Sequence, residues 1–300
     1  MKAYENVLGK IIEIIEKNKI LIWEKDWVSF EHKNYATKRE YIGFVNKMLL
    51  SATMGEKGYI YPFWLTFRQI SQIGYSLKKG EKGVPVSFFK KITVEKTIED
   101  EDGNIETIEV EIPILKYFVV FNIQQLKEFK EIEWKIRKNI KEKNLGLFEP
   151  KPNVLERLLL KYCENENIKI VNGKPSYVPS EDTIRIIPRE LFKTYSGYLA
   201  TFAHECVHST GMPKRLNRFG FSWQEKEEYA FEELVAEIGA SYLMGKYNID
   251  YSLHNSAAYI KGWVKYLKEH KKALFMAAAK AEKAIAYIEK AVVIQNKDVA

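Results

Sequence analysis

Cysteine, histidine and long apolar runs are all scarce in this chain of 300 residues. Cys163 and Cys206 are its two cysteines, too few for a disulfide framework. No stretch stays apolar and uncharged over the roughly 18 residues that a transmembrane helix needs. Glu and Lys interrupt the segment Met1 to Lys19, so it lacks the apolar core of a secretory signal. We therefore expect a cytoplasmic protein with no membrane partner.

Basic residues outnumber acidic ones, and the excess lies near the N-terminus. The formal net charge is +7, and residues 1–90 hold 15 Lys and Arg against 9 Asp and Glu. A basic domain favours a polyanionic partner such as a nucleic acid, although many basic proteins bind nothing anionic. The chain is long enough for two domains.

Two of the five histidines bracket a glutamate in His204-Glu205-Cys206-Val207-His208. Residues four apart lie on one face of a helix, so both imidazoles could bind one zinc ion, and Glu205 could reach a water on that ion. The flanking residues are apolar and predict a buried helix, with stop signals shortly after His208. The alternative interpretation is a pair of core histidines satisfied by hydrogen bonds.

A second helical run, from Tyr229 to Ala240, carries acids among apolar residues. Buried acids are costly unless they are paired or bind a metal, so we assign Glu233 as the third ligand. Glu237, one turn later, would orient a ligand histidine. Glu232 points about 100° away and is the alternative ligand. The run could also be a solvated acidic face.

Three protein ligands leave a fourth position for water, whose pKa zinc lowers to about 7. Glu205 would accept its proton and pass it to a leaving amine. His and carboxylate ligands also accept Mn²⁺ and other divalent ions. The sequence does not choose among four candidate stabilisers of an oxyanion: Tyr195, Tyr198, Tyr229 and His254. Upstream, Pro175–Pro179 and Asp182–Pro188 predict two short strands. Pro188 suits an edge or terminal position for the second strand, which could pair with an extended substrate or form an ordinary hairpin.

The first part of the chain predicts a mixed α and β domain. Residues 3–22 have the pattern of an amphipathic helix. Four further segments predict strands: Val84–Lys90, Ile92–Thr97, Ile105–Ile112 and Lys116–Asn122. The charged segment 127–150 is the expected linker, so we divide the chain into domains 1–148 and 149–300. The fold class is α+β, with a mostly helical second domain and a small antiparallel sheet.

Aromatic and cationic residues alternate in the first domain, as they do on surfaces that stack single-stranded bases and neutralise phosphates. We assign Lys78, Lys79 and Lys82 as phosphate contacts. Further candidate DNA contacts are Arg68, Trp27 and Tyr41. The alternative is that these aromatics form the core, which we expect for Trp64, Phe67, Phe118 and Phe121.

Several motifs together resemble the ArdC-type antirestriction proteins of plasmids and conjugative elements. The matching segments are Trp64–Ile70, Lys78–Gly83, Val120–Gln125, Asp182–Ile184 with Pro188, His204–Gly211, Tyr229–Glu237 and Asn255–Trp263. A tight glycine–asparagine pair of the family is spaced more widely here, as Gly43 and Asn46.

The resemblance implies an N-terminal domain that binds single-stranded DNA and a C-terminal zincin-like metallopeptidase domain. It also implies a divalent metal on His204, His208 and Glu233, and protection of incoming DNA from host restriction. Whether the peptidase is active stays open. The alternative function is a cytoplasmic zinc metalloprotease whose N-terminal domain recognises a protein substrate.

Overall fold

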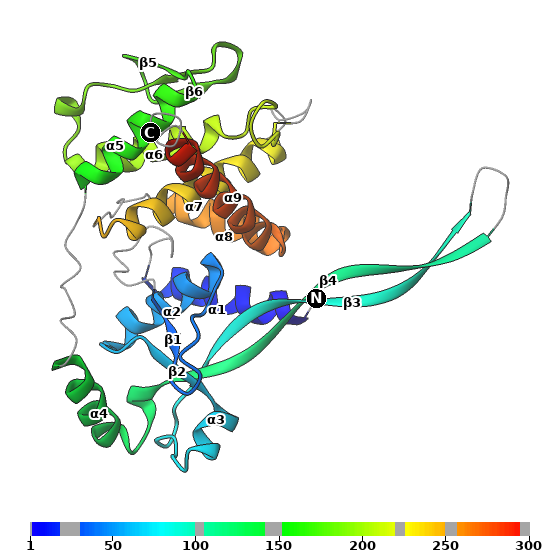
Figure 1. Cartoon of the computed structure of the whole chain (residues 1–300), viewed down its shortest axis with the longest axis vertical. Coiled ribbons are helices and arrows are strands. Elements are labelled where there is room, and N and C mark those ends of the chain that lie inside the picture. Colours follow the sequence, from blue (N-terminus) through cyan, green and yellow to red (C-terminus); the bar gives the residue numbers. More distant parts are fainter. Residues whose placement is uncertain are drawn as a thin grey trace.

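The protein consists of an N-terminal part built on a four-stranded sheet and a C-terminal part made mostly of helices (Figure 1). The structure, a computed structural model, describes residues 2–18, 31–99, 105–141, 152–219, 226–249 and 257–294. This arrangement confirms the predicted α+β class. The predicted boundary at residue 148 lies outside the described residues.

The N-terminal sheet has the strand order β1-β2-β4-β3. Its strands are β1 (Lys33–Asn34), β2 (Phe63–Thr66), β3 (Val84–Glu99) and β4 (Ile105–Asn122). The β1–β2 pair is parallel and the other two pairs are antiparallel. The helices of this part are α1 (Lys2–Asn18), α2 (Phe44–Lys57), α3 (Phe67–Gln72) and α4 (Phe129–Lys141).

The predicted first helix forms because its apolar residues recur at helical spacing. Val7, Ile11 and Ile15 are fully buried on one face of α1. Helix α1 ends at Asn18 in the described part of the chain, while residues 19–22 of the predicted helix lie outside it. Helices α1 and α2 both contact β3, and this packing gives the sheet its core.

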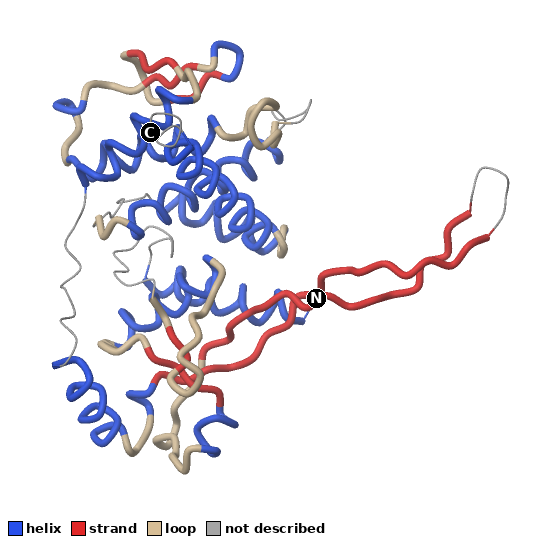
Figure 2. Tube along the Cα trace, in the orientation of Figure 1, coloured by secondary structure: helices blue, strands red, loops and turns tan. Residues whose placement is uncertain are grey.

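Strands β3 and β4 form one long hairpin that projects from the body of the protein (Figure 2). The sequence predicted four separate strands here, but pairing is continuous from Val84↔Val120 to Glu99↔Ile105. The edge of β3 is closed by Asn46 of α2. The Ser87 backbone N–H donates to Asn46 Oδ1 at 2.8 Å, and Asn46 Nδ2 donates to the Ser87 carbonyl at 2.7 Å. Asn46 therefore serves as a side-chain extension of the sheet.

The C-terminal part has five α-helices among its described residues and a small sheet at one end, which contacts α5 and α6 (Figure 1). Its elements are α5 (Pro152–Asn165), β5 (Lys169–Val171), β6 (Ser176–Val178), β7 (Thr183–Arg185), α6 (Tyr195–Ser209), α7 (Lys226–Lys246), α8 (Ala257–Glu269) and α9 (Ala273–Ile294). The expected antiparallel sheet is mixed: its order is β5-β7-β6, with β5 parallel to β7. The additional strand β5 is short and exposed, so it carries no alternating pattern. None of the described helices is long and apolar enough to cross a membrane.

The two parts share a continuous hydrophobic core. Tyr4 of α1 packs edge-on against Phe275 of α9, with ring centroids 4.9 Å apart. The N-terminus of α2 follows Gly43, which has no side chain to cap it, and the Glu282 carboxylate of α9 accepts the Phe44 backbone N–H instead. The N-terminal part is thus fixed to the helices of the C-terminal part by both apolar and polar contacts.

Candidate metal centre

Helix α6 positions the two histidines of the HExxH segment. Its first turn is capped by Thr194, whose hydroxyl accepts the Gly197 N–H at 3.0 Å. Most of its other side chains are buried, which fixes the rotation of the helix. His204 and His208 therefore lie on one face, with ring centroids 4.6 Å apart.

Helix α7 approaches α6 closely because a glycine lies at the contact. A Cβ atom on Gly239 would lie 2.7 Å from Val207 Cγ2, shorter than any ordinary contact. The two backbones can therefore come together only where this position has no side chain. This packing brings Glu233 of α7 opposite the histidine pair.

Three donor groups converge as metal ligands would. Glu233 lies 3.5 Å from His204 Nε2 and 3.4 Å from His208 Nε2, and the two Nε2 atoms are 3.0 Å apart. Donors about 2.0–2.1 Å from a tetrahedral ion are themselves separated by about 3.3 Å. The three residues thus fit one divalent ion, and this is the ligand set expected from the sequence.

The electrostatics of the cluster favour a positive charge at its centre. Burial lowers the pKa of His208, but hydrogen bonds and charges from Glu232 and Glu233 outweigh it and raise this pKa to about 10. Burial raises the pKa of Glu233, whereas hydrogen bonds from His204 and His208 lower it, and the net shift is downward. Carboxylates thus favour a cation where a metal would bind.

Glu205, the expected general base, is 6% exposed. Burial raises its pKa, and the charges of His204 and His208 act in the opposite direction. The backbone of Tyr177 in the edge strand β6 also hydrogen-bonds to this carboxylate. The strand predicted from Asp182–Pro188 is central, so the edge beside α6 is β6 instead.

The carboxylate behind His208 is Glu232, and the orienting role expected for Glu237 stays a prediction. Glu232 Oε1 lies 3.4 Å from His208 Nδ1, on the side of the ring away from the cluster. Arg218 holds it with two hydrogen bonds, from Nη2 at 2.6 Å and Nε at 3.0 Å. Because Glu232 and Glu233 differ by about 100° around α7, they reach the two nitrogens of one imidazole.

A second buried arginine fixes the edge strand to the end of α6. Arg215 is fully buried and pairs with Glu166 at 2.7 Å and with Asp182 at 2.8 Å. It also donates to the Ser209 carbonyl at 3.0 Å, and Asp182 in turn accepts the Tyr177 hydroxyl at 2.6 Å. Sequence reasoning missed both arginines, since their carboxylate partners lie 14 to 49 residues away along the chain.

The candidate oxyanion stabilisers occupy different places. Tyr229 lies closest to the cluster: burial and a hydrogen bond to Glu233 raise its pKa to about 12. The Tyr195 hydroxyl donates to Glu156, and Tyr198 is largely buried at the start of α6. His254 lies outside the described residues. Of the three described candidates, Tyr229 alone hydrogen-bonds to a residue of the metal cluster.

The candidate DNA contacts are only partly on the surface. Arg68, Lys78, Lys79 and Lys82 are exposed, and Lys78 Nζ donates to the Gln124 carbonyl at 2.8 Å. Tyr41 is 8% exposed, with its hydroxyl bonded to Asn34, so its ring is not an open stacking surface. Trp27 lies outside the described residues.

Some aromatics that were expected in the core are instead exposed. Phe67 is 63% exposed and Phe118 is 37% exposed, and Phe118 lies beside the exposed Phe88 at 5.7 Å between ring centroids. Trp64 is buried as predicted. The sequence does not reveal which face of the sheet the helices cover, and this explains the misplacement of Phe118; Phe67 is instead the first residue of the short helix α3, where only Ile70 is buried.

Family models match both parts of the chain. The model of the N-terminal domain of anti-restriction factor ArdC matches residues 1–121, and a zincin-like metallopeptidase model matches residues 158–280. The converging His, His and Glu side chains lie within the second range. The C-terminal part is therefore a zincin-like domain, joined to an ArdC N-terminal domain.

Solved structures of the antirestriction ArdC protein from plasmid R388 are similar over nearly the whole chain. The metal-free form is 31% identical, with a TM-score of 0.66, and covers 97% of this chain and 98% of that one. The Mn(II)-bound form is 30% identical over the same shares, with a TM-score of 0.65. The chain belongs to the ArdC family of antirestriction proteins.

Curated relatives extend the similarity. A DNA primase TraC of Escherichia coli is 30% identical over 298 residues, which cover 93% of this chain and 26% of the relative. The uncharacterized protein y4eC of Sinorhizobium fredii is 27% identical, over 93% of this chain and 89% of its own length. The chain thus spans about a quarter of the length of that TraC protein.

Proposed function

We propose that this protein binds single-stranded DNA, carries a divalent metal in its zincin-like domain, and protects incoming DNA of a mobile element from host restriction. The proposal rests on one observation above all: an ArdC-type N-terminal domain and the convergent cluster of His204, His208 and Glu233 occur in one chain.

The N-terminal surface offers what a single strand needs. Phe67 on α3 and the Phe88–Phe118 pair are exposed rings on which bases can stack, at roughly 1–3 kcal/mol per base. Arg68 and the lysines of the segment Lys78–Lys82 supply exposed positive charge. A duplex keeps its base faces stacked inside, so these rings favour single strands.

The metal would be held by His204, His208 and Glu233, with Glu232 fixing the orientation of His208. Zinc is our candidate, and manganese is bound by the similar R388 protein. When bound, the ion supplies a Lewis acid that activates water. Glu205 holds or releases a proton at its buried carboxylate, and β6 lies beside it as an edge for an extended chain.

A titration of labelled single-stranded and duplex DNA, followed by fluorescence anisotropy, tests the DNA-binding part. We expect the protein to bind the single strand more tightly than the duplex. Replacing Lys78, Lys79 and Lys82 with Gln should reduce the slope of log K against log salt by about two, since fewer counterions are released. A matched control replaces three exposed lysines of the C-terminal part, Lys169, Lys174 and Lys193. Equal affinity for duplex and single strand contradicts the proposal.

A metalloprotease acting on a protein substrate is the second candidate function. The observation that favours it is the position of buried Glu205 between the metal cluster and the edge strand β6. In that case Glu205→Gln abolishes cleavage while metal binding is retained. If Glu205→Gln leaves antirestriction intact in a plasmid-transfer assay, proteolysis is not its basis.

A further inference from the structure

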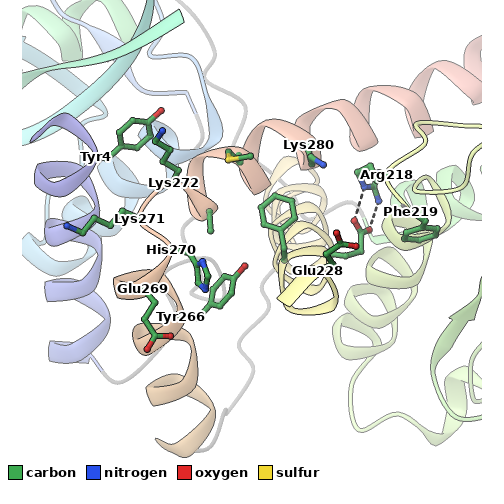
Figure 3. A pocket seen from close by; sticks show the side chains of 14 residues that line it. Tyr4, Arg218, Phe219, Glu228, Tyr266, Glu269, His270, Lys271, Lys272 and Lys280 are labelled. Carbon is green, nitrogen blue, oxygen red and sulfur yellow. Dashed lines mark hydrogen bonds and ion pairs between the residues drawn. The ribbon is translucent and has the colours of Figure 1, made fainter. Parts of the chain in front are cut away.

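A pocket of about 640 Å³ lies where the two parts of the protein meet, away from the exposed rings of the N-terminal sheet. Helix α1 contributes Tyr4 and α7 contributes Phe231, while Lys271 and Lys272 come from the turn between α8 and α9 and Lys280 from α9 (Figure 3). Arg218 and Glu232, the pair behind His208, form its far wall. The pocket thus adjoins the metal centre without including its ligands.

Two lysines at this pocket carry charge that no described carboxylate neutralises. Lys272 and Lys280 each lie over an aromatic ring, 5.9 Å from the centroid of Tyr4 and 5.2 Å from that of Phe231. Two neighbouring lysines are instead paired: Lys268 with Glu16 and Lys271 with Glu5, both on α1. Lys272 and Lys280, with no ion pair to a described residue, therefore bring positive charge into the pocket, whose lining also includes Glu228 and Glu269.

Rings and cations at this spacing suit a ligand that is both flat and anionic. A nucleotide has a base that stacks on a ring and a phosphate that pairs with lysine. Lys272 and Lys280 are eight residues apart, about 12 Å along the helix, so they can contact different phosphates of one strand. A purely apolar ligand would leave both charges unused.

We propose that this pocket is a second binding site for single-stranded nucleic acid, with phosphates on Lys272 and Lys280 and a base against Tyr4 or Phe231. The inference rests on the proposed DNA-binding function and extends it to the C-terminal part. A strand held here lies next to Arg218 and Glu232, and hence beside the metal centre.

The salt dependence of binding tests this site in the full chain. In the double variant Lys272→Gln/Lys280→Gln, the slope of log K against log salt for a dT oligonucleotide should fall by about 1.4, since each phosphate contact on a single strand contributes about 0.7. The control Lys283→Gln/Lys290→Gln makes the same charge change on exposed residues of α9 outside the pocket. If the pocket variant and the control variant have equal slopes while the parent still binds DNA, the pocket is not a binding site. The proposed DNA-binding function is then unaffected.

A label inside the pocket gives a second, independent measurement. Met276 is 52% exposed and lines the pocket, whereas the native cysteines are buried, so Met276→Cys can be labelled selectively with a fluorophore. We expect the dT oligonucleotide to change the emission of the fluorophore on Met276→Cys. The emission of a fluorophore on Lys290→Cys, outside the pocket, should not change. If the emission of the label changes only with a poly-glutamate peptide, the pocket does not bind nucleic acid. If dTMP binds as tightly as the oligonucleotide, the pocket binds a mononucleotide and not a strand. Either result overturns the proposal.

Discussion

Arg218 holds Glu232 in a two-point hydrogen bond, and Glu232 in turn lies against the outer nitrogen of His208. The Arg218 side chain is 4% exposed, and its guanidinium also donates to the Val207 carbonyl at 2.8 Å and to Thr210 Oγ1 at 2.7 Å. The loop after α6 is thereby fixed to the end of that helix. The direction of the His208 ring is set by a chain of contacts that begins outside the metal cluster.

Removing this support should weaken metal binding without removing a ligand. We expect Glu232→Gln to lower the affinity for Zn²⁺ or Mn²⁺ by about 10- to 100-fold, as is usual when a carboxylate behind a ligand histidine is lost. Isothermal titration calorimetry measures the change. Glu237→Gln, on the same helix, is the control, and an equal or larger loss in that variant would favour the role that the sequence suggested for Glu237.

The convergence of His204, His208 and Glu233 could be predicted because it depends largely on local geometry. His204 and His208 are four residues apart, which determines their shared face on any helix, and Glu233 is an acid on an apolar run. The choice between Glu232 and Glu237 depends instead on how α7 is rotated against α6. That rotation follows from a tertiary contact between Gly239 and Val207, which no local pattern reports.

The close approach at Gly239 predicts a cost for any added side chain. In Gly239→Ala the new methyl group would meet Val207 at 2.7 Å, so the helices must separate. We expect a loss of about 1–3 kcal/mol in the free energy of unfolding, measured by urea denaturation, together with weaker metal binding. Gly262→Ala on α8 is the control, since nothing lies within 4 Å of the added atom, and it should be neutral or stabilising. Equal stability of the two variants would contradict this account.

The Arg215–Asp182 pair should be important for stability. In Asp182→Asn the left-handed backbone at this position is still tolerated, but the buried side chain of Arg215 retains only Glu166 as an anionic partner among the described residues. We expect a loss of roughly 3 kcal/mol in the free energy of unfolding. Glu181→Gln removes a neighbouring exposed pair with Arg185 and should cost less than about 0.5 kcal/mol. A small effect of Asp182→Asn would show that Arg215 is held by its other partners.

Buried His32 predicts a specific dependence of stability on pH. Its Nδ1 accepts the Trp64 indole N–H at 3.1 Å, and its Nε2 lies 2.7 Å from Ser51 Oγ, so the folded protein holds a neutral imidazole. Burial and the charge of Lys47 lower its pKa from 6.5 to about 3. Between these values the unfolded chain binds a proton that the folded protein does not, so stability is lost as the pH falls below 6.5.

In chelator-treated protein, the contribution of His32 to the slope approaches one proton, about 1.4 kcal/mol per pH unit, as the pH falls from 6.5 to 5. Urea denaturation between pH 6.5 and 5 measures it above the range in which most carboxylates titrate. In His32→Gln, the amide can accept from Trp64 and donate to Ser51 without titrating, so its slope should be smaller by about one proton. The folded pKa of His208 is raised to about 10, so this imidazole stays protonated in the folded protein while it titrates near pH 6.5 in the unfolded chain, and its contribution to the slope has the opposite sign. That contribution is the same in the parent and in His32→Gln, so it cancels in the difference between their slopes. Parallel slopes for the parent and His32→Gln would mean that His32 is protonated in the folded protein.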